Sequence, residues 1–336
     1  MKTKTDLKWH LRVTVLPQCN FRCRYCNPKG IHQKTETLND DEILEITEAA
    51  VACGIVRVHW TGGEPCIRDM VKLIQGATDR GMVEQIMTTN GSLRFNEIDA
   101  MRTAGLTRVN ISLDSLNKAR NSQITGAKAF ETTIKWIIKS CQTFDTITKM
   151  NIVPMTDNLN EIPEMIEFAK SMNGKLWLKF IELCPNNPAF YGDEIQQYFV
   201  GRNQLIEKLT SVGNLTLAAG IGDNPNAEYY WVGNTGVKII LITMPTYNFK
   251  CGLGNCHKMR ISPFGIAGSC IQQKGEKLIG LPLTEKIKVI QKLMDIRHSY
   301  SDIPPVSRQH LRKDYGIWRF GDISNLTDQA KECARC

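Results

Sequence analysis

The chain has 336 residues, of which 42% are apolar and 23% charged, a composition typical of a folded globular protein rather than a disordered or fibrous one. Its net charge of +8 is scattered without a long basic run. A positive net charge suits the binding of phosphorylated small molecules, an acidic electron-transfer partner or nucleic acid, although no nucleic-acid recognition motif is present. No apolar run could cross a bilayer and the first residues lack a secretory signal's apolar core, so we expect a cytoplasmic protein without a membrane partner.

Short apolar strands alternate with amphipathic helices through the first half of the chain. The predicted strands are Leu11–Leu16, Val56–Thr61, Gln85–Thr89, Arg108–Leu113, Lys149–Val153 and Trp177–Leu183. The predicted helices are Asp40–Cys53, Met70–Arg80, Asn96–Ala104, Phe130–Thr143 and Glu161–Met172. The first of these helices begins at Asn39, and Glu42 is placed for a capping box. Six strand–helix units predict a parallel sheet, and because a complete TIM barrel needs eight, an open (β/α)6 partial barrel is expected over residues 1–220.

The rhythm changes in the second half of the chain. Turn-rich segments separate a predicted helix at Arg202–Ser211, an apolar strand at Val237–Thr243 and a helix near Thr284–Arg297. A new group of cysteines lies in the same region. We therefore expect a second, smaller domain over residues 221–336.

Polar residues recur at one parity within the otherwise apolar strands. They are Arg12 and Thr14, His59 and Thr61, Asn110 and Ser112, Lys149 and Asn151, and Lys179. Because side chains alternate between the two faces of a strand, each set points to one face. Helices cover the outer face of a barrel, so these side chains are expected to line a polar lumen. The simpler alternative is that they are polar because the ends of the strands are exposed to solvent. The tryptophans Trp60, Trp136 and Trp177 are expected in the core.

Three cysteines, Cys19, Cys23 and Cys26, follow the first strand with the spacing C-x3-C-x2-C. In a reducing compartment, clustered cysteines are more often metal ligands than disulfides. Three thiolates in one loop can hold three irons of a four-iron cluster and leave the fourth open to chelate S-adenosylmethionine (SAM). The alternatives are a redox pair and a zinc site, which normally takes four protein ligands and finds no well-spaced histidine here.

These motifs together resemble the radical SAM superfamily. The Thr61-Gly-Gly-Glu-Pro65 segment matches the family's Gly-Gly-Glu-Pro motif, which contacts the SAM amino group, and Tyr25 matches the aromatic residue near the adenine. The resemblance implies reductive cleavage of SAM to a 5′-deoxyadenosyl radical by an enzyme with a [4Fe–4S] cluster on Cys19, Cys23 and Cys26. It also implies a set of SAM-binding residues: Tyr25, Gly62, Gly63, Glu64, Asn90, Ser112 and Cys184.

A second cysteine group, Cys251, Cys256 and Cys270, makes a second [4Fe–4S] cluster plausible. Here the chain resembles the GTP 3′,8-cyclases of molybdenum-cofactor biosynthesis, a lyase family in which the open iron of a second cluster binds the purine. The spacing departs from that family, because four residues instead of two lie between the first two cysteines. The chain also ends in Cys333-Ala-Arg-Cys336 where the cyclases end in Gly-Gly. Cys333 and Cys336 are candidate ligands of the second cluster or of another metal, a redox pair, or part of a frayed end.

The cyclase resemblance also implies residues that grip a nucleotide. Arg12, Thr88, Lys149 and Arg260 match positions that bind GTP, whereas His59, Lys179 and Lys258 stand where the family has arginine. Arginine and lysine are not equivalent toward phosphate, which leaves room for a different nucleotide. The implied partners are a small-molecule substrate, an electron donor such as flavodoxin or ferredoxin, and a second subunit of a homodimer. Two alternatives stay open: a twitch-type radical SAM enzyme that modifies a peptide, sugar or nucleoside, and a non-catalytic metal protein that binds a partner.

Overall fold

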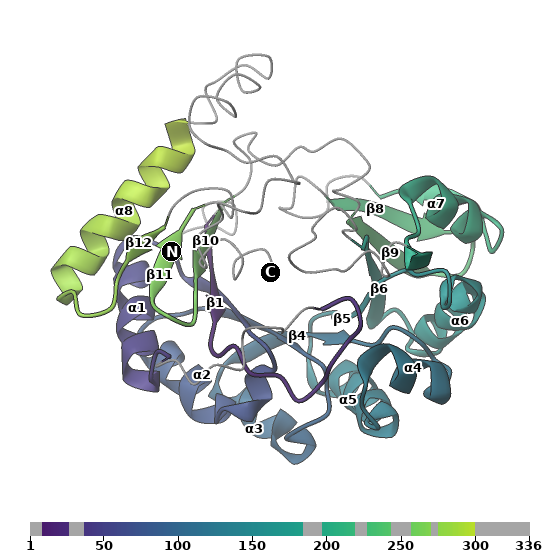
Figure 1. Cartoon of the computed structure of the whole chain (residues 1–336), viewed down its shortest axis with the longest axis horizontal. Helices are drawn as coiled ribbons and strands as arrows, with labels where there is room; N and C mark the ends of the chain where they lie inside the picture. Colours follow the sequence, from purple (N-terminus) through teal and green to yellow (C-terminus); the bar gives the residue numbers. More distant parts are fainter. Residues whose placement is uncertain are drawn as a thin grey trace.

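A computed structural model describes residues 9–26, 37–183, 197–218, 227–242, 257–269 and 275–299. Its strands form one twelve-stranded sheet in the order β12-β11-β10-β1-β2-β3-β4-β5-β6-β9-β8-β7. The first six strands are β1 His10–Thr14, β2 Arg57–Thr61, β3 Glu84–Thr89, β4 Leu106–Ser112, β5 Thr148–Ile152 and β6 Leu176–Ile181. Consecutive members of this set pair in parallel, and helices lie on the outer side of the arc that they form (Figure 1). The predicted α/β fold, a partial TIM barrel of six strand–helix units, is confirmed.

The helices lie close to their predicted bounds. They are α1 Asp40–Ala52, α2 Met70–Asp79, α3 Ile98–Ala104, α4 Lys118–Thr125, α5 Phe130–Thr143, α6 Ile162–Ser171, α7 Arg202–Thr210 and α8 Leu283–Ser299. The capping box of α1 is present, since the Asn39 side chain accepts from Glu42 N and the Glu42 side chain accepts from Asn39 N. Helix α4 was not predicted, because its sequence has little apolar periodicity. Only three of its residues are buried.

Strands from the second half of the chain join the same sheet. They are β7 Leu215–Leu217, β8 Ala227–Val232, β9 Val237–Ile242, β10 Lys258–Ile261, β11 Ile266–Gly268 and β12 Glu276–Lys277. β9 pairs in parallel with β6, and β10 pairs in parallel with β1 on the other side of the arc. The sheet therefore runs across the predicted boundary near residue 220, and the division into two domains stays a prediction. Of these strands only β9 was predicted: β7, β10, β11 and β12 have four residues or fewer, whereas the Tyr-Tyr-Trp-Val run of β8 was a signal that was missed.

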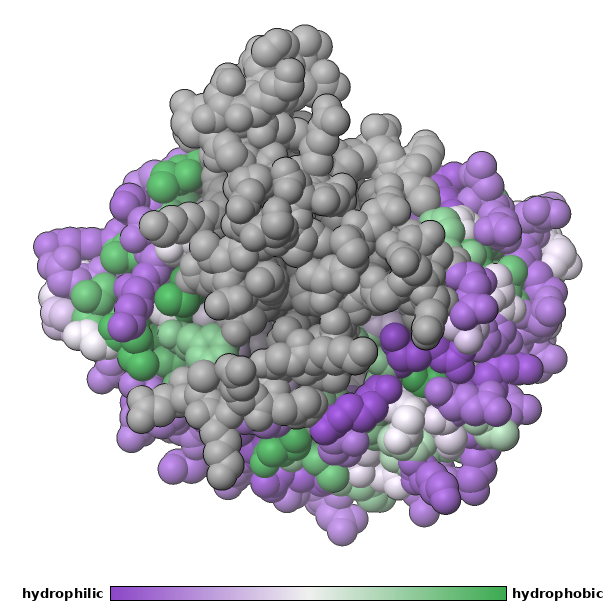
Figure 2. Space-filling model, viewed as in Figure 1, coloured by the Kyte–Doolittle hydropathy of each residue, from purple (hydrophilic) through white to green (hydrophobic). Residues whose placement is uncertain are grey.

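The core fills the space between the sheet and its helices. Trp60 and Trp136 are fully buried there, as predicted. The prediction for Trp177 was wrong: it is only partly buried and is the register partner of Lys149, on the lumen face of the sheet. On the viewed face, much of the described surface is hydrophilic, with small apolar areas between the polar side chains (Figure 2). None of the described helices has the length and apolar character needed to span a bilayer.

Candidate functional site

The cysteine loop is held against the loop that follows β2. The backbone N–H of Gly63 donates to Leu16 O at 2.8 Å, and that of Glu64 donates to Gln18 O at 2.8 Å. The two chains pass so closely that a Cβ at Gly62 would lie 2.6 Å from Leu16 O, and one at Gly63 would overlap Gln18 O. Both glycines are therefore required by the close approach of the two backbones. Through this contact the Gly-Gly-Glu-Pro segment fixes the start of the cysteine loop.

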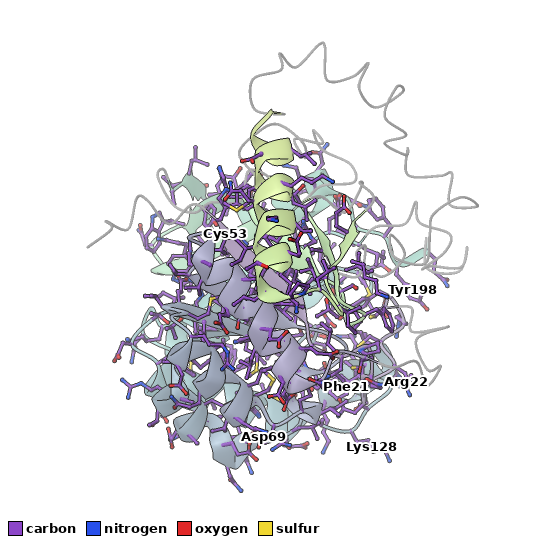
Figure 3. The ribbon with its side chains drawn as sticks, turned by 90° about the vertical axis from the view of Figure 1, so that its left-hand side faces the viewer. Phe21, Arg22, Cys53, Asp69, Lys128 and Tyr198 are labelled. Atoms are coloured by element: carbon purple, nitrogen blue, oxygen red, sulfur yellow. The ribbon has the colours of Figure 1, made fainter. Side chains whose placement is uncertain are left out.

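The middle of the loop is held on its other side by the end of α4. Arg22 N donates to Thr125 O at 2.8 Å, and Arg24 N donates to Ile124 O at 2.9 Å. The Arg24 guanidinium also lies 4.5 Å from the centre of the Tyr198 ring. Figure 3 shows Phe21, Arg22 and Tyr198 toward one side of the molecule, whereas Cys53 lies beside α8. The loop after β2 and the end of α4 thus hold the cysteine segment from two sides.

The three thiols fit an iron–sulfur cluster. Cys19, Cys23 and Cys26 are free cysteines, and Cys26 N donates to Cys23 O at 3.0 Å in a tight turn. Burial raises the pKa of Cys19 and Cys23, which makes bare thiolates unfavourable there and favours compensation by bound iron. In the described ranges, no three histidine, cysteine or acidic side chains are close enough to share one metal ion. Three cysteines in one loop suit a cubane, in which each thiolate binds a different iron.

Glu64 ties the loop after β2 to the end of β3. Its side chain is 1% exposed, and its carboxylate accepts from Thr89 Oγ1 at 2.6 Å, Asn90 N at 2.7 Å and Cys66 N at 3.0 Å. Burial raises the pKa of Glu64, and these three donors oppose the rise. The side chain therefore positions the backbone on both sides of the site.

Asn90 lies directly against the cysteine loop. Its Nδ2 is 3.9 Å from Cys19 Sγ and donates to Asn20 Oδ1 at 3.0 Å. Asn20 in turn donates from Nδ2 to Ser92 Oγ at 2.8 Å. Among the other residues expected at the SAM site, Tyr25 lies in the loop itself and Ser112 ends β4, while Cys184 is outside the described residues. The structure thus brings six of the seven expected residues to the carboxyl ends of β1 to β4 or to the adjoining loop.

The predicted polar lumen lies inside the sheet. Arg12 is the register partner of His59 on β2 and of Arg260 on β10, and Asn151 is the partner of Lys179 on β6. Strand β10 also places Lys258 beside His10. Since register partners share a face of the sheet, the basic residues predicted from strand parity come together with the two from the second half.

Polar contacts inside the lumen are incomplete. His59 Nε2 lies 2.7 Å from Thr88 Oγ1, and Asn110 Nδ2 donates to the same oxygen at 3.3 Å. By contrast, Arg12 Nε, Asn110 Oδ1 and Asn151 Oδ1 are buried without a hydrogen-bond partner in the part of the chain that is described. Buried polar atoms normally find partners, so these three groups fit a bound polar molecule or ordered water.

The lumen is strongly electropositive. Burial, together with the charges of Lys149, Arg12, Lys258 and Arg108, lowers the pKa of Lys179 to about 7. The pKa of His59 is well below its usual value because of burial and the neighbouring cations Arg12 and Lys179. These mutual effects show that cations from β1, β4, β5, β6 and β10 converge on one space.

The sequence argument missed several lumen residues, among them His10, Arg57, Glu84, Arg108 and Lys238. Arg57 Nε lies 2.8 Å from Glu84 Oε2, and Arg108 lies 3.6 Å from Glu84 Oε1. Parity was the available signal, since Arg57 alternates with His59 and Arg108 with Asn110, whereas His10, Arg57 and Glu84 are the first residues of β1, β2 and β3. Glu84 is the one acidic residue with lumen parity on described strands β1 to β6, β9 and β10, and two arginines already neutralise it.

The cysteines expected to hold a second cluster, Cys251, Cys256 and Cys270, lie outside the described residues, as do Cys333 and Cys336. The neighbouring strand β10 is described, and it carries Lys258 and Arg260 beside β1. The segment after Cys256 therefore returns to the barrel at the strand that precedes the first cysteine loop.

Comparison with known proteins agrees with this geometry. Residues 13–169 match the family model of the radical SAM superfamily. A GTP 3′,8-cyclase of Synechococcus elongatus is 32% identical over 273 residues, covering 80% of this chain and 81% of the relative. A GTP 3′,8-cyclase of Listeria welshimeri is 28% identical over 323 residues, covering 92% of this chain and 94% of the relative. The crystal structure of Streptococcus suis SuiB matches with a TM-score of 0.61 and 14% identity, covering 87% of this chain and 68% of SuiB.

A partial barrel with three free thiols in a loop beside a Gly-Gly-Glu-Pro turn defines a radical SAM enzyme, and the chain belongs to that superfamily. Its cofactors are accordingly a [4Fe–4S] cluster and SAM. Within the superfamily, it belongs to the family that includes the GTP 3′,8-cyclases.

Proposed function

We propose that this enzyme acts on a phosphorylated purine nucleotide and that its reaction is a radical cyclisation of the GTP 3′,8-cyclase type. One observation carries the proposal: five basic side chains from four strands share the lumen beneath the cysteine loop. They are Arg12, Lys149, Lys179, Lys258 and Arg260. Glu84, the one acidic residue with lumen parity on the described strands β1 to β6, β9 and β10, is engaged by Arg57 and Arg108. A polyanionic substrate suits this concentration of positive charge.

The lumen also accounts for the orientation of such a substrate. The cations lie within the barrel, whereas Cys19 and Asn90 lie beyond the carboxyl ends of β1 and β3. A nucleotide whose phosphates bind the cations would extend its sugar toward the cysteine loop. This order places the reactive part of the substrate between the phosphate-binding residues and the SAM site.

The residues at the rim suit SAM. We assign Cys19, Cys23 and Cys26 to the cluster, and Gly62, Gly63, Glu64, Asn90, Ser112, Tyr25 and Cys184 to SAM binding. When bound, these cofactors supply a 5′-deoxyadenosyl radical, which takes a hydrogen atom from the substrate sugar. The protein's own part is to hold the loop rigid through Glu64, to neutralise the phosphates through the lumen cations, and to fix the ribose through His59 and Thr88.

The remaining expectations belong to this proposal. A second cluster on Cys251, Cys256 and Cys270, with Cys333 and Cys336 as further candidate ligands, would hold the purine base. A protein such as flavodoxin or ferredoxin would deliver the electron, and the +8 charge of the chain favours an acidic donor. We also propose a homodimer and a cytoplasmic location.

The direct test is anaerobic incubation of the reconstituted enzyme with GTP, SAM and a chemical reductant. We expect 5′-deoxyadenosine together with a cyclised nucleotide, detected by mass spectrometry. Formation of 5′-deoxyadenosine without any altered nucleotide would count against GTP as the substrate. Formation that GTP fails to induce, but that a peptide or sugar does induce, would favour the twitch-type alternative.

A second test isolates the lumen from the chemistry. Tripolyphosphate should bind the protein, and Lys149→Met should weaken that binding by about tenfold, the loss of one charge-assisted contact of ~1.4 kcal/mol. The matched control is Lys170→Met, because Lys170 pairs with Glu167 on the exposed outer side of α6. Equal affinities for tripolyphosphate in the wild type and Lys149→Met would contradict the assignment of the lumen cations.

A further inference from the structure

Asp114 is a buried carboxylate that the site described so far does not use. It follows β4 by two residues and is 2% exposed. Each of its carboxylate oxygens has one neutral donor: Oδ1 accepts from Val153 N at 2.8 Å, and Oδ2 accepts from Tyr25 Oη at 2.7 Å. No cation pairs with it within the described ranges. Burying a carboxylate on two neutral donors costs free energy, so its retention calls for a specific task.

The partner of Asp114 lies at the centre of the proposed site. Tyr25 stands between Cys23 and Cys26, and its phenol reaches across to the loop beyond β4. The backbone bonds described above hold Gln18, Arg22 and Arg24, which precede this turn. The Tyr25–Asp114 bond therefore ties the last part of the cysteine loop to the barrel.

Asp114 is itself held firmly. Its backbone carbonyl accepts from Asn158 Nδ2 at 2.7 Å, and the same nitrogen donates to Val153 O at 2.9 Å. Asn158 Oδ1 accepts from Met155 N at 2.8 Å. The loops after β4 and β5 thus form one hydrogen-bonded unit, and Tyr25 is anchored to that unit rather than to a single side chain.

We propose that Asp114 is a positioning residue that fixes Tyr25, and with it the turn from Cys23 to Cys26, before SAM binds. The inference rests on the proposed placement of Tyr25 at the adenine. When the aromatic ring is already held in place, SAM binding does not include the entropic cost of ordering the ring and the loop. Asp114 then acts on affinity for SAM through Tyr25, without contact with SAM itself.

Tyr25→Phe is the sharpest test, because it removes the phenol and keeps the ring. In the anaerobically reconstituted protein, we expect SAM to bind about tenfold more weakly, which corresponds to ~1.4 kcal/mol. In the protein without its cluster, the Cys26 amide, which donates to Cys23 O, should exchange its hydrogen faster than in the wild type. Tyr198→Phe is the matched control: it removes a neighbouring phenol whose ring packs on Arg24, and both readouts should stay at wild-type values.

Variants of Asp114 separate positioning from mere stability. Asp114→Asn can still accept from Val153 N with its oxygen and donate to the Tyr25 oxygen with its amide, so it should retain most of the affinity for SAM. Asp114→Ala loses both contacts and should match or exceed the loss in Tyr25→Phe. Wild-type affinity and wild-type amide exchange in Tyr25→Phe, or equal effects of Tyr25→Phe and Tyr198→Phe, would overturn the inference. Failure of the wild-type protein to bind SAM would instead contradict the proposed function, and this inference with it.

Discussion

Glu64 accepts a hydrogen bond from the backbone N–H of Asn90 at 2.7 Å, so the loop that carries the Gly-Gly-Glu-Pro motif and the loop that packs against Cys19 move as one unit. A carboxylate suits this place because it accepts at both oxygens. Oε1 takes Thr89 Oγ1 and Cys66 N, while Oε2 takes Asn90 N.

Glu64→Gln should therefore destabilise the protein although it conserves shape. The glutamine amide has one acceptor oxygen, and its NH2 group would face a backbone N–H in a site that is 1% exposed. We expect the free energy of unfolding of the cluster-free protein to fall by ~1–3 kcal/mol, measured by urea denaturation. Glu48→Gln is the control, since the Glu48 side chain is 46% exposed and its 3.6 Å contact with Arg80 contributes little. Equal stability of Glu64→Gln and the wild type would show that Glu64 does not hold these two loops together.

Gly63→Ala should disrupt the cysteine loop by steric overlap. The added Cβ would meet the Gln18 carbonyl, which is backbone and cannot rotate away. We expect a loss of at least ~2 kcal/mol in stability and a lower iron content after reconstitution. Gly201→Ala is the comparison, because a Cβ there has its nearest neighbour, Phe199 Cε1, at an ordinary 3.6 Å. An iron content in Gly63→Ala equal to that of Gly201→Ala would show that the close approach is not needed.

Lys179 should make stability rise with pH. Its pKa is about 7 in the folded protein, below the value of ~10.4 expected in the unfolded chain. Between these two values the unfolded state binds more protons, so the free energy of unfolding increases as the pH rises from about 7 to about 10. In Lys179→Met this contribution should be absent, which urea denaturation at a series of pH values can measure. Parallel curves for the two proteins would contradict the assignment.

The same lysine should take up a proton when a polyanion binds. A phosphate beside Lys179 favours its charged form and raises its pKa above about 7. Calorimetry of tripolyphosphate binding near pH 8, in two buffers of different ionisation enthalpy, should show proton uptake that disappears in Lys179→Met. His10 and His59 contribute little at this pH, because their pKa values lie well below that of a free histidine. An enthalpy independent of the buffer would place the anion elsewhere.

Much of the barrel could be predicted from local pattern. Its strands and helices have clear apolar periodicity, and caps such as Asn39 mark where a helix begins. The lumen positions of Arg12, His59, Lys149 and Lys179 followed from parity alone, because a charged residue in a buried strand must point away from the helices. The cysteine loop followed from its spacing, and the Gly-Gly-Glu-Pro turn from its resemblance to the radical SAM motif.

What was missed depends on contacts between distant segments. β10 has four residues and no apolar run, so nothing local indicates that it pairs beside β1 and brings Lys258 and Arg260 into the lumen. The link from Tyr25 to Asp114 spans 89 residues, so no local pattern indicates it. Trp177 was assigned to the core by residue type, although its parity with Lys179 indicated the lumen.

The central claim, that Cys19, Cys23 and Cys26 alone hold a cluster that SAM can reach, has one direct measurement. In a full-length variant with alanine at Cys251, Cys256, Cys270, Cys333 and Cys336, only the first group of clustered cysteines remains. After anaerobic reconstitution and reduction, electron paramagnetic resonance should show one [4Fe–4S] signal, with about four irons per chain, that changes when SAM is added and is lost on further replacement of Cys23 by alanine. A signal that ignores SAM, or that survives the loss of Cys23, would contradict the account.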